Sequence, residues 1–479
     1  MTQTLSPLDG RYRKQVAPLL EFFSEDALNR ARLLVEVEWL ILLCNGAAPP
    51  SHGQVIAAPV LPGAPHLSDG DIAVLRHFVT DFDTEAASQL GEIEAETRHD
   101  VKAIEYYLAR KIGAELPHIP PELIHFAFTS EDVNNLAYAL NIKTALTLVW
   151  LPTAEKLVAQ LTQLAHATAQ MAMLSRTHGQ AASPTTLGKE LAVFVLRLQR
   201  QLAKIAAVPV LGKSNGATGT FGAHLAAVPD ADWLAVSQQF VTSLGLEWNP
   251  VTTQIESHDW QAELFSDVTR FGRILHNLAT DIWTYISLGY FTQIPPQGSV
   301  GSSTMPHKIN PIRFENAEAN LEISGALFDS LAATLVTSRL QRDLTDSTTQ
   351  RNVGVAFGHS LLAMDNILQG LTTIHPNPAL MLADLDENWE VLAEPIQTAM
   401  RAAAIAGVPG MANPYERLKD LSRGHKLTAH EVRQFIASLG LPAEATARLA
   451  ALTPAAYTGL AEAITTQFLP PLEADSPAE

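Results

Sequence analysis

The sequence predicts a mostly α-helical protein whose largest part is a bundle of long helices. Apolar residues recur at steps of three and four over long stretches, which places them on one face of a helix. Alternating apolar and polar runs, which are typical of strands, are scarce. The chain has 479 residues, of which 47% are hydrophobic, so it can bury a large core in two or three domains.

The long helices are expected in the middle of the chain. The first two candidates, 131–150 and 153–172, are separated by Pro152, which suits the first turn of the second helix. The third candidate, 187–205, carries its apolar stripe on Leu187, Leu191, Phe194, Leu198, Leu202 and Ile205. The same pattern returns in two later stretches, 258–292 and 312–337. Core packing explains such stripes, and they say nothing about chemistry.

Stretches rich in Pro and Gly divide the chain at 46–70, 116–122 and 374–380. The first is typical of a surface excursion, and the other two are typical of domain boundaries. We therefore expect three domains, namely an N-terminal helical domain over 1–117, a central long-helix bundle over 118–373 and a C-terminal helical domain over 374–479.

The charge balance and the single cysteine limit the possible partners and compartments. The net charge is −18, whereas nucleic acid and anionic membranes require clustered positive charge, so neither is expected as a partner. An anionic ligand would need a site that gathers the scarce cations. Cys44 alone cannot form an internal disulfide and fits a reducing compartment. The N-terminus has no apolar signal core, and the most apolar helical stretch carries Glu36 and Glu38, so a cytoplasmic protein is expected.

Two segments resemble known motifs but fail on spacing. GKSNGATG at 212–219 lacks the glycine that a phosphate-binding loop needs five residues before Gly212, and it follows no strand-like run. A turn between helices is the better interpretation. HEVRQ at 430–434 lacks the second His of a zinc-protease motif, and the other histidines show no metal-ligand spacing, so no metal is expected.

Two polar segments lie next to expected helix ends, and each has a plain structural explanation. His178 lies in LSRTHGQ between two apolar helices, where a capping or turn histidine is at least as good an explanation as a catalytic one. Arg98, His99 and Asp100 lie in ETRHDVK near a helix start, where the alternative is a solvated first turn.

Two further segments are candidates for binding anions. FTSEDVNN contains Thr129 and Ser130, which suit the cap of a helix with acids in its first turn. Free hydroxyl and N–H groups at a helix N-terminus also suit a carboxylate ligand. SRLQRDLTDSTTQRN places Arg342 and Arg351 on either side of Ser347, which predicts either a surface strip of ion pairs or a phosphate clamp.

The loop 295–311 contains GSSTMPHKINP, and linker chemistry does not explain it. Its glycines and prolines predict a mobile lid. Asn310 followed by Pro311 predicts a helix start, with Asn310 as the cap and Pro311 at the first helical position. Ser302, Ser303 and Lys308 then lie beside a helix N-terminus, where developing negative charge is stabilised. Spacing alone establishes no Ser-His-Asp arrangement.

The residues of this loop, together with the polar segments described above, resemble those of a known family. GSSTMPHKINP matches the signature loop of the fumarase/aspartase superfamily, which is roughly GSSxMPxKxNP. Six further segments, DGRY, TRHD, TSED, SRTHGQ, TTQIE and QRDLTDSTTQRN, together resemble the adenylosuccinate lyase family. The resemblance implies a fumarase/aspartase-like fold of three domains. It also implies a homotetramer in which three subunits build each active site.

The activity that the resemblance implies is that of a lyase in purine nucleotide biosynthesis. It would cleave adenylosuccinate to AMP by β-elimination of fumarate. It would also cleave the succinyl-carboxamide ribotide intermediate SAICAR to its amide, AICAR. Neither reaction would need a cofactor or a metal.

The resemblance also implies roles for residues of this chain. Ser302 would be the general base, chosen over Ser303 by its place in the motif, and His178 the general acid, oriented by Glu315. His99 would lie near the leaving nitrogen or the phosphate. The groups expected to stabilise the carbanion are Lys308, Asn310, Thr129 and Ser130. The groups expected to hold the nucleotide phosphate or the succinyl group are Arg11, Tyr12, Arg342, Ser347, Arg351 and Gln254. The remaining expected substrate contacts are Arg98, Asp100 and Asn316.

Two alternatives stay open at this point. Argininosuccinate lyase, fumarase and aspartase share the signature loop but have no phosphate to bind, so they leave the arginines of QRDLTDSTTQRN unexplained. A non-catalytic structural protein on the same fold, as in lens crystallins related to argininosuccinate lyase, would not need Ser302, His178 and Lys308.

Overall fold

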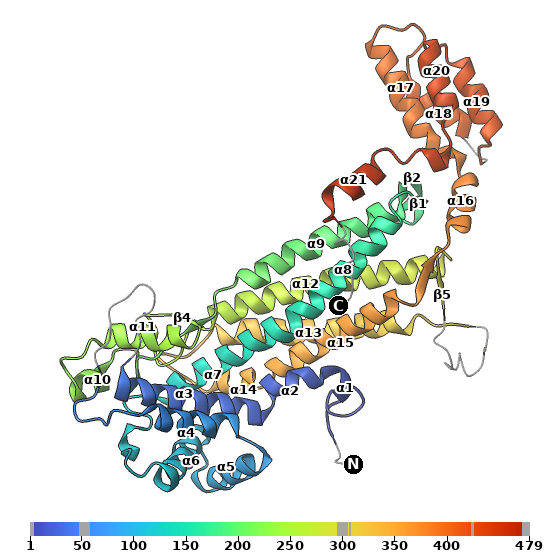
Figure 1. Ribbon diagram of the computed structural model, residues 1–479. Helices are drawn as coiled ribbons and strands as arrows, with labels where there is room; N and C mark the ends of the chain where they lie inside the picture. The colour runs from blue at the N-terminus through green and yellow to red at the C-terminus, as the bar shows by residue number, and fades with distance from the viewer. Residues whose placement is uncertain (1–3, 47–57, 295–304, 306–307, 423–425, 472–479) are drawn as a thin grey trace. The chain divides into compact units, whose positions relative to one another are not determined.

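The computed structural model describes residues 4–46, 58–294, 305, 308–422 and 426–471, and for 419–422 it describes the backbone alone. Helices dominate, and three two-stranded sheets account for the strands in the described chain (Figure 1). The prediction of a mostly α-helical class is confirmed. Within the described residues, no helix combines the length and the apolarity that crossing a membrane requires.

Two compact units divide the chain. The first comprises Met1–Ala154, Gln201–Arg273 and Ala319–Ala363, and the second comprises Glu155–Arg200, Ile274–Glu318 and Met364–Glu479. Five long helices contribute residues to both, namely α8 Leu151–Ala167, α9 Leu187–Ala207, α12 Asp259–Ser287, α13 Ile312–Leu335 and α15 Val353–Leu371. The expected division into three domains stays a prediction.

The first unit is built around helix α3. Its other helices are α1 Arg13–Val16, α2 Leu20–Phe23, α4 Asp69–Thr80, α5 Thr84–Thr97, α6 Asp100–Glu115, α7 Ser130–Ala145, α10 Gly222–Ala227, α11 Trp233–Ser243 and α14 Thr345–Gln350. α3, Glu25–Asn45, packs against α4, α6 and α7. Trp39 of α3 is fully buried and stacks on Phe128, and its indole N–H donates to the Phe126 carbonyl at 3.0 Å. Two short parallel strands, β3 Leu211–Gly212 and β4 Glu247–Trp248, complete this unit.

Pro152 lies in the first turn of α8, as predicted, but no break separates α8 from the helix before it. α7 passes into a π-helical turn over Leu146–Trp150 and then into α8. The Leu151 N–H donates to the Leu146 carbonyl five residues back. Such a turn is a known way to accommodate a residue that lacks an N–H donor. The predicted helix 153–172 is wrong at its end, because α8 stops at Ala167.

A β-hairpin in the second unit was not predicted. Strands β1, Ala172–Thr177, and β2, Gln180–Thr186, pair in antiparallel fashion, with Thr177 opposite Gln180. His178 and Gly179 alone connect them, with φ of 52° and 75°. Positive φ at both central residues defines the tight turn whose twist matches the flanking strands. Thr-His-Gly-Gln is therefore a hairpin tip and not a plain junction between helices.

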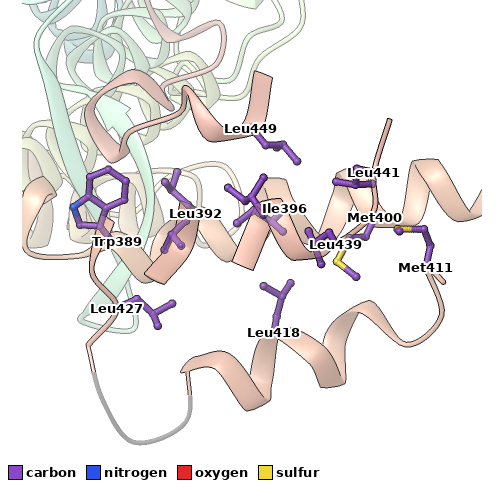
Figure 2. Packing of buried hydrophobic residues seen from close by; sticks show 12 residues of the cluster. Trp389, Leu392, Ile396, Met400, Met411, Leu418, Leu427, Leu439, Leu441 and Leu449 are labelled. Carbon is purple, nitrogen blue, oxygen red and sulfur yellow. The ribbon is translucent and has the colours of Figure 1, made fainter. Parts of the chain in front are cut away.

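The C-terminal part of the second unit has its own apolar core (Figure 2). The helices of this C-terminal part are α16 Pro378–Asp386, α17 Ala393–Ile405, α18 Pro414–Ser422, α19 Ala429–Ser438, α20 Ala443–Ala450 and α21 Ala461–Phe468. Ile396 and Met400 of α17, Val432 and Ile436 of α19 and Leu449 of α20 are buried together. Two further strands of this unit, β5 Phe291–Gln293 and β6 Ile374–Pro376, pair in antiparallel fashion.

We expect Gly188→Ala to lower the free energy of unfolding by roughly 1–3 kcal/mol, the usual cost of overpacking. A Cβ at Gly188 in α9 would lie 2.3 Å from the Ala165 carbonyl oxygen and 2.6 Å from the Ala169 Cα, and backbone cannot move aside cheaply. Gly113→Ala in α6 is the matched control, because apart from its neighbours and the backbone of its own helix no heavy atom lies within 4 Å of the added Cβ. Thermal unfolding of both variants checks the prediction. An unchanged midpoint for Gly188→Ala would contradict it.

Candidate active site

The predicted site residues are divided between the two units. The first unit holds Arg11, Tyr12, Arg98, His99, Asp100, Thr129, Ser130, Gln254, Arg342, Ser347 and Arg351. The second holds His178, Lys308, Asn310, Glu315 and Asn316. Ser302 and Ser303 lie outside the described residues.

Residues 98–100 form the corner between α5 and α6. Arg98 ends α5 in the left-handed conformation, and His99 caps α6 by accepting the Lys102 N–H on Nδ1 at 3.2 Å. This bond requires Nδ1 to be free of a proton, so a neutral His99 carries its proton on Nε2. The His99 side chain is 52% exposed. Nε2 is therefore available as a donor to a ligand.

Asp100 is more than part of a solvated first turn. Its carboxylate lies 2.6 Å from the guanidinium of Arg32, which is 2% exposed, and 3.2 Å from that of Arg351. The Val101 N–H also donates to it at 2.9 Å. Burial opposes ionisation of Asp100, but the two arginine charges and these hydrogen bonds outweigh it, so the pKa of Asp100 lies below its usual value. Asp100 is thus a fixed anion that orients Arg351.

Thr129 and Ser130 begin helix α7, as predicted. The Thr129 N–H donates to the carboxylate of Asp132 at 2.8 Å, which closes the first turn. Both residues are half-buried. The first N–H groups of a helix have no partner within it, so this end can bind an anion.

The segment 212–219, which does not match a phosphate-binding loop, holds the start of α7 in place. Asp132 is fully buried and forms a 2.9 Å ion pair with Lys213, which is also fully buried. The backbone N–H groups of Asn215 and Gly216 donate to the same carboxylate at 2.9 and 3.1 Å. The turn over 212–219 therefore binds an anion, but that anion is a side chain of the same unit.

Gln254 and Arg342 are brought close together. The Gln254 N–H donates to the Gln341 carbonyl at 3.3 Å, and its side-chain amide donates to the Ala217 carbonyl at 2.9 Å. The Arg342 guanidinium lies 2.7 Å from the carboxylate of Glu131, which is 4% exposed. The segment 341–351 thus meets the start of α7 and the 252–256 segment, which places three predicted ligand segments in one region of the first unit.

Ser347 lies on the short helix α14, and Arg351 directly follows that helix. Arg351 lies 2.9 Å from Glu25 and 3.2 Å from Asp100, and Ser347 donates its N–H to Asp346 at 2.7 Å. Burial opposes ionisation of Asp346, but contacts from His258 and Arg342 keep its pKa below the usual value. The predicted strip of ion pairs is present, and it reaches buried carboxylates.

The N-terminal segment contributes Arg11 and Tyr12. The Arg11 guanidinium lies 5.7 Å from the centre of the Tyr12 ring. Tyr12 packs against Leu8, Val16 and Leu362. Arg11 is exposed, so its charge remains accessible to a ligand.

In the second unit, His178 is exposed at the tip of the β1–β2 hairpin. Glu315 lies in the first turn of α13 and accepts the indole N–H of Trp283 at 3.1 Å. Within the described part of a single chain, no hydrogen bond joins His178 to Glu315. The predicted pairing of these two residues therefore stays a prediction about the assembled site.

Residues 308–316 follow the signature loop. Lys308 and Asn310 are exposed, and Asn316 is half-buried in α13. α13 begins at Ile312, so Pro311 and not Asn310 directly precedes it. The Pro311 carbonyl accepts the Phe314 N–H at 3.1 Å, which makes Pro311 the capping residue. Asn310 as the helix cap was therefore wrong by one residue.

Sequence reasoning missed the side chains that hold the predicted substrate-binding residues in place. These are Glu25, Arg32, Glu131 and Lys213. Arg32 offered a signal, because it interrupts the apolar stretch of α3 with a charge that burial would require to be paired. Its partners Asp100 and Asn134 are 68 and 102 residues away in sequence, so pairing could not be inferred locally.

Comparison with known proteins gives the family. The sequence matches the family described as Lyase over residues 10–322 and the family described as Adenylosuccinate lyase C-terminal over residues 338–458. Adenylosuccinate lyase of Escherichia coli K12 is 48% identical over 459 residues, which cover 95% of this chain and 96% of that protein. Adenylosuccinate lyase of Haemophilus influenzae is 46% identical over 458 residues, with 95% and 96% covered.

Two solved structures share the fold. The 3-carboxy-cis,cis-muconate lactonizing enzyme from Pseudomonas putida has a TM-score of 0.70 at 20% identity, covering 94% of this chain and 95% of that one. The fumarate lyase from Mesorhizobium sp. BNC1 has a TM-score of 0.72 at 19% identity, covering 94% and 97%. At such identities the likeness shows the fold alone. The family matches and the curated relatives go further, and the chain therefore belongs to the adenylosuccinate lyase family, a family of fumarate-releasing lyases within the fumarase/aspartase superfamily.

Proposed function

We propose that this chain cleaves adenylosuccinate to AMP and fumarate, and SAICAR to AICAR and fumarate. The observation that carries the proposal is that Arg342 lies beside Glu131 at the start of α7 and Arg351 lies beside Asp100 at the start of α6, in a chain of net charge −18. Scarce cations held by fixed carboxylates form a site for a phosphate. Fumarase and aspartase substrates carry no phosphate, so this cluster favours a nucleotide substrate.

The elimination needs a base, an acid and a site for negative charge. Ser302 removes a proton from the carbon beside one carboxylate of the succinyl group, and the electron pair moves into that carboxylate to give a doubly charged carbanion. Lys308 and Asn310, with the hydroxyls of Thr129 and Ser130, stabilise this charge. The C–N bond then breaks, and His178 donates its proton to the departing nitrogen. Fumarate and the amine product result, and no redox partner is needed.

The remaining residues bind and orient the substrate. Arg11, Tyr12, Arg342, Ser347 and Arg351 hold the phosphate. Gln254 contacts the succinyl group, and the exposed Nε2 of His99 suits the leaving nitrogen or the phosphate. Arg98, Asp100 and Asn316 are further substrate contacts, and Glu315 orients His178.

The assembly and the cellular site are part of the same proposal. The chain forms a homotetramer in which three subunits supply each active site, and it works in the cytoplasm. Membership of the adenylosuccinate lyase family supports both statements. The three-domain protomer, divided at about residues 117 and 373, is proposed on the same basis.

The experiment that tests this function follows both products directly. Purified protein incubated with adenylosuccinate, without added metal, is expected to yield AMP and fumarate in equal amounts by mass spectrometry. SAICAR is expected to yield AICAR and fumarate under the same conditions. Turnover of argininosuccinate with none of adenylosuccinate would overturn the proposal in favour of another enzyme of the superfamily. No turnover of any of the three by folded protein would favour a non-catalytic role.

A further inference from the structure

Arg351 is occupied by two carboxylates. One terminal nitrogen of its guanidinium lies 2.9 and 3.0 Å from the two oxygens of Glu25, and the other lies 3.2 Å from Asp100. A phosphate that binds Arg351 must share it with these groups or displace one of them. The two carboxylates differ in how firmly they are held.

Asp100 is the fixed partner. It is paired with Arg32, a buried residue whose guanidinium is also bonded to Asn134 at 2.9 Å. The low pKa of Asp100 keeps it charged. Releasing Asp100 would leave the buried charge of Arg32 unpaired, which is strongly unfavourable.

Glu25 is the exchangeable partner. Its side chain is 68% exposed, and it stands at the first position of α3 after the capping residue Ser24. Both of its oxygens bond to a single nitrogen of Arg351, so it lacks the two-nitrogen fork that makes arginine–carboxylate pairs strong. Exposed ion pairs of this kind contribute little to stability. Glu25 can therefore leave Arg351 at small cost.

The other arginine of the cluster offers a contrast. Arg342 pairs with Glu131, which is 4% exposed and accepts a 3.0 Å hydrogen bond from Asn134. Glu131 is thus held in place from two sides and cannot turn into solvent. Of Arg342 and Arg351, it is Arg351 that is paired with a carboxylate free to move away.

There is open space beside Arg351. A cavity of about 130 Å³ is lined by Arg351, by Ser6 and Asp9 of the N-terminal segment that continues into Arg11 and Tyr12, and otherwise by glycine and apolar residues. A smaller cavity of about 30 Å³ is lined by Glu25, Tyr138 and Arg351. Arg351 therefore borders open space beside one of the proposed phosphate-binding segments and also borders Glu25.

We propose that Glu25 exchanges with the substrate phosphate on Arg351. In the empty site Glu25 neutralises Arg351, and when the nucleotide binds, its phosphate takes the place of Glu25 while Asp100 keeps the guanidinium oriented. A phosphate carries nearly two negative charges against one for a carboxylate, so it outcompetes Glu25 where a singly charged group would not. Glu25 thus weakens the hold of Arg351 on the phosphate and eases release of the phosphorylated product. The inference rests on the proposed role of Arg351 in binding phosphate.

Glu25→Gln is the direct test, with AMP as the probe in a calorimetric titration. Removing the competing charge is expected to tighten AMP binding about 3- to 10-fold. AMP then no longer has to break the exposed Arg351–Glu25 ion pair, and its phosphate is no longer repelled by the Glu25 carboxylate. Binding of adenosine, which has no phosphate, is expected to stay unchanged. Glu21→Gln is the matched control, because Glu21 is 71% exposed on α2, pairs with Arg30 and is not a ligand of Arg351. It is expected to leave AMP affinity unchanged.

Arg351→Gln separates failure of this inference from failure of the proposed function. If it weakens AMP binding while Glu25→Gln leaves AMP affinity unchanged or weakens it, Glu25 is not exchanged for phosphate and the inference is overturned. If Arg351→Gln leaves AMP affinity unchanged, Arg351 does not bind the phosphate, and the proposed role on which the inference rests is wrong. Thermal unfolding of each variant checks that it is folded.

Discussion

Replacing His178 by asparagine is expected to lower kcat for adenylosuccinate by roughly 10²–10⁴-fold, the usual contribution of a positioned general acid. His178 occupies a tight two-residue turn with φ of 52°, and asparagine tolerates this left-handed conformation. The substitution therefore removes the proton donor while it keeps the hairpin that carries it. Alanine would combine the chemical loss with backbone strain, so asparagine gives the cleaner result. Steady-state kinetics with the purified protein provides the measurement.

A second histidine supplies the control for this experiment. His430 is exposed in α19 of the same unit, and His430→Asn is expected to leave kcat and KM unchanged. A substrate with a better leaving group should recover part of the activity of His178→Asn, because protonation of the nitrogen is the step that is lost. Near-normal turnover of His178→Asn would remove His178 from the mechanism. A loss of turnover that is the same for every leaving group would assign His178 a binding role only.

The helices were predictable from sequence because their signal is local. The stripe over 187–205 matches α9, Leu187–Ala207, and the stripe over 258–292 matches α12, Asp259–Ser287, within a few residues at each end. The hairpin around His178 was not predictable in the same way. Its strands are short and mixed in polarity, so period-two alternation is absent, and the left-handed His-Gly pair was its only sequence signal.

The candidate site was predictable only where a motif carried it. The segments at 98–100, 129–130 and 342–351 were found by resemblance, and the first unit brings them into one network of charges. The residues that hold this network, such as Arg32 and Glu131, belong to no motif. Their partners are distant in sequence, and periodicity within a helix gives no information about contacts between helices.

Among the buried contacts around the candidate site, the ion pair of Lys213 and Asp132 is expected to contribute most to the stability of the fold. Both side chains are fully buried, and the pair joins the start of α7 to the turn over 212–219. Lys213→Met is expected to lower the free energy of unfolding by about 3–5 kcal/mol, because it leaves a buried carboxylate without its countercharge. Backbone N–H groups still donate to Asp132 at 2.8 and 2.9 Å, which places the expected loss toward the lower end. Urea unfolding followed by circular dichroism gives the measurement.

Two further variants separate the lost charge from the lost packing. Lys102→Met removes a lysine whose 2.7 Å pair with Glu105 is 45% exposed on the lysine side, and it is expected to cost less than about 1 kcal/mol. Adding Asp132→Asn to Lys213→Met removes the unpaired charge and keeps an acceptor for the N–H groups, so the double variant is expected to recover part of the loss. Equal destabilisation of the single and double variants would instead assign the effect to the shape of the lysine. In that case Thr129 and Ser130 would owe their position to packing alone, and the charge of Asp132 would play no part in presenting the start of α7 to a substrate.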